Sequence, residues 1–123
     1  MSDPADPAAY IAAVLTLYVD LPDTPLRASV SDQSLARRFH DAGVPLHAVE
    51  TALLLGSLRR LIRPAGAPPL SPIRSLAYFR PVIEELHVHP VPDGYLDYLR
   101  LKLRRAATAL PADVQKSTFS DDR

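Results

Sequence analysis

The chain of 123 residues contains no cysteine, which excludes disulfide bonds and thiolate metal ligands. Its four glycines are isolated, so the glycine-rich loop that cradles phosphate groups is missing as well. No apolar run reaches the roughly 20 residues that span a bilayer. The first ten residues, MSDPADPAAY, carry no basic group ahead of an apolar stretch, unlike a secretory signal. These absences predict a cytoplasmic protein that does not enter a membrane.

An excess of one charge is also lacking, because 14 basic residues balance 14 acidic ones. The charges are unevenly distributed along the chain. Residues 1–36 hold five aspartates and one arginine, whereas residues 56–105 hold eight arginines and one lysine against four acids. The basic half could orient an acidic ligand, although basic patches of this size also occur in proteins that bind none.

Apolar residues recur along the chain at the spacing of helices, and the sequence has no strand alternation and no hairpin turn signals. Apolar spacing and proline or glycine breaks predict helices over about 7–20, 31–42, 45–63, 75–86 and 94–110. The third is apolar almost all round and should lie at the centre. We therefore predict an all-α fold, a compact bundle of about five helices. Residues 7–110 would form one domain, with disordered ends at 1–6 and 111–123.

Local signals refine three of these helices. Ser31 or Asp32 is the expected cap of the second helix, with Leu35, Phe39 and Ala42 as its buried stripe and a left-handed Gly43 at its end. Pro45 suits the first turn of the third helix. In the fourth helix, apolar residues keep helical register across Pro81, which predicts a helix that continues with a kink. The alternative is a short turn followed by a new helix that begins at Pro81.

The sequence contains no strong motif for catalysis, metal binding or DNA binding. Residues 34–53 have the helix–turn–helix order, but the bulky Phe39 occupies the position where that motif has a small residue, so a simple helical hairpin is favoured. His87 and His89 could form a ligand pair, but too few further ligands lie near them in the sequence. We expect no catalytic residues, no metal, no cofactor and no enzymatic activity.

Basic and tyrosine side chains are the candidate binding residues. Tyr95, Tyr98, Lys102 and Arg105 share one face of the fifth helix, where tyrosines could stack on bases and cations could pair with phosphates. The alternative is that the tyrosines pack at the edge of the core and the charges are simply solvated. The other candidates follow the same logic: Arg59, Arg60, Arg63, Arg74, Arg80, Arg100 and Arg104.

The order of segments resembles a known family. A helix that ends in HDAG leads into VPLHAVETAL, and SLAYFRPVIEEL follows after an interruption. Over residues 10–86 this resembles the C-terminal helical domain of DnaD-type primosomal proteins. The chain departs from that family in lacking its closing tryptophan and in a longer, proline-rich stretch at 64–72. The resemblance implies an accessory protein of DNA replication or of a mobile element, with Tyr78, Arg80 and the basic residues beyond them in contact with DNA.

Two functions are therefore expected. The first is a non-enzymatic accessory protein that binds nucleic acid, DNA in preference to RNA, and the alternative is a protein-interaction or scaffolding subunit that can form a homo-oligomer. Ion pairing discriminates between them. If Arg59, Arg63, Arg100 and Arg104 pair with Asp20, Asp23 and Asp32, the basic region serves the fold.

Overall fold

Helices account for all the regular structure of residues 6–108, the part of the chain that the computed structural model describes. Their order and bounds are α1 Pro7–Val19, α2 Val30–Asp41, α3 Leu46–Leu61, the 3₁₀ helix η1 Leu76–Phe79, α4 Arg80–Val88 and α5 Tyr95–Thr108. The all-α prediction is confirmed. The predicted disordered ends lie outside these residues, except for Asp6, which is the N-cap of α1.

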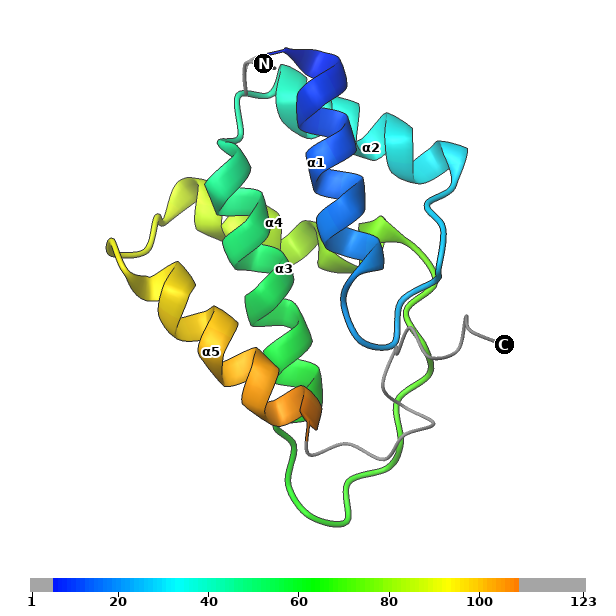
Figure 1. The fold of residues 1–123 in the computed structure, drawn as a ribbon, viewed down its shortest axis with the longest axis vertical. Coiled ribbons are helices and arrows are strands. Elements are labelled where there is room, and N and C mark those ends of the chain that lie inside the picture. The colour runs from blue at the N-terminus through cyan, green and yellow to red at the C-terminus, as the bar shows by residue number, and fades with distance from the viewer. Residues whose placement is uncertain (1–5, 109–123) are drawn as a thin grey trace.

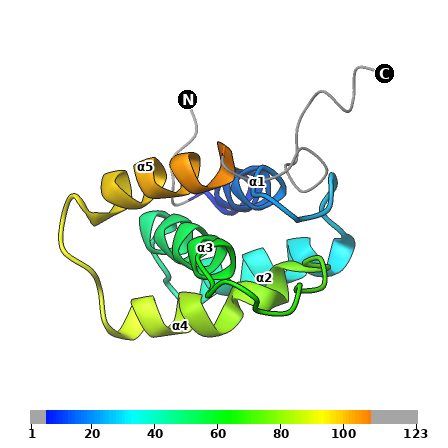
Figure 2. The same cartoon turned by 90° about the horizontal axis from the view of Figure 1, so that it is seen from below.

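The helices form layers around α3 (Figures 1 and 2). In Figure 2, α1 and α5 lie on one side of α3, and α2 and α4 lie on the other. Because α3 packs against α1, α4, α5 and η1, it buries residues around most of its circumference. The predicted central position of the third helix is confirmed.

Between α2 and α3 the chain turns sharply. Gly43 adopts a positive φ of 79°, and the Val44 N–H donates to the Phe39 carbonyl at 3.0 Å, so the left-handed end predicted for α2 is confirmed. Pro45 is the N-cap of α3 and not a first-turn residue. The expected hairpin is wrong, because α2 packs chiefly against α1.

The start of α2 differs from the prediction. Ser29 is the N-cap, and Asp32 is the third helical residue of a reciprocal capping box. The Asp32 N–H donates to the Ser29 hydroxyl at 3.1 Å, while the Ser29 N–H donates to the Asp32 carboxylate at 2.9 Å. The buried residues of α2 are Asp32, Ala36 and Phe39, and Leu35 is half-buried against the core. The prediction was wrong for Ala42, which is the exposed C-cap.

The fourth helical segment changes type at Pro81. The apolar residues expected to face inward, Leu76, Phe79, Ile83 and Leu86, are all buried, which confirms the register across the proline. The kink is wrong, and the structure has the alternative, a short turn followed by a new helix. A 3₁₀ turn ends at Phe79, and α4 begins at Arg80, one residue before the predicted start at Pro81. A proline there breaks no α-helical hydrogen bond, because the first N–H groups of an α-helix have no partner within it.

Gly56 allows the closest approach between α3 and η1. A Cβ atom at Gly56 would lie 2.7 Å from the ring of Phe79, which is itself fully buried. The absent side chain therefore provides the space that the aromatic ring fills.

Candidate interaction surfaces

Arg60 is built into the fold and is not a surface cation. Its side chain is 8% exposed, and Nη2 donates to the Asp23 carboxylate at 2.6 Å and to the Ser71 carbonyl at 2.8 Å. Its Nη1 donates to the Tyr78 hydroxyl at 3.3 Å, and the guanidinium lies 5.3 Å from the centroid of that ring. Burial lowers the pKa of Arg60, but the hydrogen bonds to Tyr78 and Asp23 outweigh burial and raise it overall. Arg60 and Tyr78, both predicted to bind nucleic acid, thus hold the end of α3 to two loops.

Three of the other candidate arginines, Arg59, Arg80 and Arg100, lie beside carboxylates. Arg100 donates to Glu50 at 2.7 Å and to Asp97 at 3.1 Å, and its hydrogen bond to Glu50 is the main cause of its raised pKa. Arg59 lies 3.7 Å from Glu85, and Arg80 lies 3.0 Å from Glu84. Exposed pairs of this kind stabilise a fold by at most about 1 kcal/mol. Each carboxylate nevertheless weakens the positive potential that a phosphate would meet.

The pairing test therefore has a mixed outcome. Arg59 and Arg100 are paired with glutamates and Asp97, not with the aspartates that were predicted. Of the predicted aspartates, Asp23 pairs with Arg60 instead. Arg63 is half-buried and donates to the carbonyl of Pro68. The predicted binding residues also fail to share one face, because η1 and α4 lie on the opposite side of α3 from α5 (Figure 2).

Helix α5 offers the most distinctive exposed surface. It packs on α3 through Leu99 and Leu103, which are buried. Away from α3, Tyr98 is 51% exposed and Leu101 is 41% exposed. We define the α5 outer face by the exposed residues Asp97, Tyr98, Leu101, Arg104 and Arg105.

Aromatic packing orders the predicted tyrosine stripe on this helix. The rings of Tyr95 and Tyr98 stack with centroids 5.9 Å apart, and Lys102 Nζ lies 5.8 Å from the Tyr98 centroid. Tyr95 and Lys102 are half-buried, so the stripe borders the core, as the second alternative expects, while its contact with bases and phosphates stays a prediction. Leu101 was not among the predicted binding residues. The sequence could have indicated it, because Leu101 is an apolar residue that lies outside the apolar stripe of its own helix.

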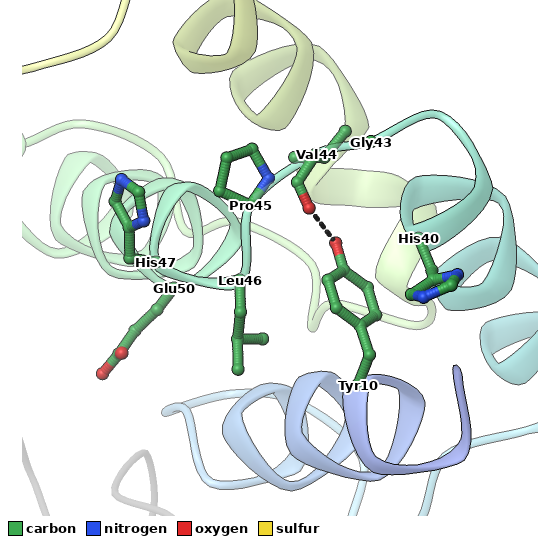
Figure 3. Close-up of a pocket in the computed structure, with 8 residues that line it drawn as sticks. All are labelled: Tyr10, His40, Gly43, Val44, Pro45, Leu46, His47 and Glu50. Atoms are coloured by element: carbon green, nitrogen blue, oxygen red, sulfur yellow. Dashed lines mark hydrogen bonds between the residues drawn. The ribbon is translucent and has the colours of Figure 1, made fainter. Parts of the chain in front are cut away.

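A cavity of about 640 Å³ adjoins the turn between α2 and α3 (Figure 3). The Tyr10 hydroxyl donates to the Val44 carbonyl at 2.8 Å, and burial raises the pKa of Tyr10 to about 12. Figure 3 shows Tyr10 and His40 on one side of the turn and His47 and Glu50 on the other. Because the polar groups do not converge on a common point, the cavity has no evident ligand chemistry.

Between residues 6 and 108, no three His, Cys, Asp or Glu side chains lie close enough together to hold a metal ion. None of the helices α1 to α5 is long and apolar enough to cross a membrane.

Comparison of the chain with protein-family models, with curated proteins and with solved structures found no match. The resemblance to the DnaD-type domain therefore stays a prediction.

Proposed function

We propose that this chain is a non-enzymatic interaction domain of the cytoplasm that acts through the α5 outer face, with a second copy of the same chain as its partner. One observation carries the proposal, namely the order of chemistry along that face. An acidic residue stands near the start of α5, apolar side chains occupy the middle, and basic residues stand near the end.

That order is complementary to itself when two copies of α5 pack antiparallel. With a two-fold axis at Leu101, the two Leu101 side chains would meet, and Asp97 of each copy would lie opposite Arg105 of the other. Tyr98 would lie opposite Arg104, an arrangement that suits a cation–π contact. A two-fold interface forms the Asp97–Arg105 and Tyr98–Arg104 pairs twice and the Leu101 contact on the axis once.

The remaining surface supports this choice over phosphate binding. Arg59, Arg80 and Arg100 each lie beside a carboxylate, which favours contacts of mixed charge. Exposed tyrosine and arginine side chains are the types that contribute most energy to protein interfaces. Since one helix face buries less than a standard interface, we expect a dimer of moderate affinity.

Sedimentation equilibrium of the full chain tests this, over concentrations from about 1 µM to about 1 mM. We expect a monomer–dimer equilibrium that Leu101→Asp shifts to monomer by at least about tenfold. Leu26→Asp is the matched control, because Leu26 is 74% exposed and lies in the α1–α2 loop, so it should leave the equilibrium unchanged. Asp97→Arg and Arg105→Asp should each weaken the dimer, and the double variant should restore it. A wild-type chain that stays monomeric at the highest concentration would refute the proposal.

Nucleic-acid binding is the second candidate, carried by the stacked Tyr95 and Tyr98 with Lys102 beside them. Exposed tyrosines can stack on unpaired bases, and flanking cations can neutralise the backbone. The protein would then be an accessory factor of DNA replication or of a mobile element, as the DnaD resemblance implies. Fluorescence anisotropy with single-stranded and duplex DNA should show binding that weakens steeply with salt and is lost in Tyr98→Ala. No binding at low salt would exclude this candidate.

A further inference from the structure

A proline-rich segment that the α5 proposal does not use links α3 to η1. We call Ala67–Arg74, with the sequence APPLSPIR, the 67–74 segment. Proline fixes φ near −65°, and a residue before proline is restricted to extended conformations. Pro68, Pro69 and Pro72, with the residues before them, therefore limit five of the eight positions. The segment shows no helix, strand, turn or bend, which is what a polyproline II conformation requires.

Most of the segment is exposed. Ile73 is 3% exposed and Ala67 is half-buried, whereas Leu70, three residues from each, is 44% exposed. The other five residues, which include all three prolines, are exposed as well. The prolines are therefore presented to solvent on a segment that the buried Ile73 attaches to the bundle.

Tertiary hydrogen bonds hold the segment in place at three points. Arg63 donates to the Pro68 carbonyl, Arg60 donates to the Ser71 carbonyl at 2.8 Å, and the Ile73 N–H donates to the Asp23 carbonyl at 2.9 Å. A free peptide loses conformational entropy when it binds. This segment has lost much of that freedom already, on folding.

We infer that the 67–74 segment is a docking site for a protein domain whose aromatic-lined groove binds polyproline II helices and whose rim carries a carboxylate for Arg74. Pro69, Pro72 and Arg74 form the spacing P-x-x-P-x-R, in which two prolines on one edge are followed by a cation. Arg74 is exposed and forms no ion pair within residues 6–108. Its charge is therefore available to a partner, unlike that of Arg60.

The inference is tested by titrating the ¹⁵N-labelled full chain with a purified SH3 domain that accepts P-x-x-P-x-R peptides, and separately with a WW domain. We expect amide shifts confined to the 67–74 segment and its anchors on addition of the SH3 domain. Arg74→Ala should weaken binding at least about tenfold, because it removes the cation that the carboxylate of the partner would bind. It should leave the fold unchanged, because Arg74 forms no hydrogen bond or ion pair within residues 6–108. Arg27→Ala is the matched control, since Arg27 is also an exposed loop arginine.

Pro69→Ala should weaken binding as Arg74→Ala does, and its circular dichroism spectrum should match the wild type. Leu101→Asp should bind the SH3 domain normally, so failure of the α5 proposal would not affect this result. No shift in the 67–74 segment with either domain at about 1 mM would overturn the inference. Equal binding by Arg74→Ala and the wild type would also overturn it.

Discussion

Replacement of Asp32 by alanine should destabilise this protein more than any substitution of an exposed acid. The Asp32 side chain is buried, with 2% of the residue exposed, and its two oxygens accept hydrogen bonds from different parts of the chain. Oδ2 accepts from the Ser29 N–H at 2.9 Å, and Oδ1 accepts from the Leu76 N–H at 2.9 Å. One carboxylate thus caps α2 and also fixes the start of η1, 44 residues away.

Two losses add up in Asp32→Ala. Removal of the reciprocal half of the capping box should cost about 1 kcal/mol. The Leu76 N–H is left buried without an acceptor, which should cost about 1–3 kcal/mol. We expect the free energy of unfolding to fall by about 2–4 kcal/mol, and the midpoint of thermal unfolding to fall by roughly 10–20 °C for a domain of this size.

Urea unfolding followed by circular dichroism measures this change. Asp41→Ala is the matched control, because Asp41 lies on the same helix but is exposed, with Arg37 at 3.8 Å, and should change stability by less than about 0.5 kcal/mol. Asp32→Asn should fall between the two, since it retains one oxygen acceptor but presents an amide donor to the other N–H. A loss in Asp32→Ala no larger than that in Asp41→Ala would refute the reasoning.

Two further predictions concern the core. Gly56→Ala should lower the free energy of unfolding by about 1–3 kcal/mol in urea unfolding, despite alanine's better helix propensity, because the new methyl group meets Phe79. The double variant Gly56→Ala with Phe79→Leu should lose less stability than the sum of the two single variants. Tyr10→Phe should lower the free energy of unfolding by about 1 kcal/mol, because it removes the hydrogen bond to the Val44 carbonyl. Tyr18→Phe should leave stability almost unchanged at neutral pH, because the buried Tyr18 hydroxyl has no partner among the described residues. Burial raises the pKa of both tyrosines to about 12, and the Asp32 charge adds to the effect at Tyr18. Between pH 10 and pH 12 the unfolded chain would lose these protons while the folded chain keeps them, so stability should fall by about 2–3 kcal/mol per tyrosine, and by less in Tyr18→Phe. A stability that is flat from pH 9 to pH 11, or equal costs for the two phenylalanine variants, would contradict this account.

Helix type and order could be predicted from the sequence because they depend on local periodicity. Tyr10, Val14 and Tyr18 recur at helical spacing and are all buried in α1. The nearly continuous apolar circumference of α3 requires neighbours on several sides, and it has them. Gly43 was predictable for the same local reason, since a left-handed residue is needed wherever a helix ends in a tight turn.

The N-cap of α2 and the helix boundary at Pro81 were less predictable, because the sequence allows more than one solution at each. Ser29, Ser31 and Asp32 could each cap a helix at this point. In the structure Ser29 is the cap, and Asp32 accepts a hydrogen bond from the Leu76 N–H, 44 residues away, which no local pattern indicates. At Pro81, a kinked helix and a new helix share the same apolar register. Only the position of the 3₁₀ turn against α3 distinguishes them.

The order of residues specifies an all-helical bundle with α3 at its centre, because amphipathic spacing is a property of that order. Arginines and tyrosines could be predicted as candidates for binding for the same reason. Which of them serve the fold depends on tertiary contacts, because a charge pairs with whatever the folded chain brings within a few ångströms. Arg60 was brought to Asp23 and buried, Arg100 was brought to Glu50, and Arg74 and the α5 outer face remained at the surface.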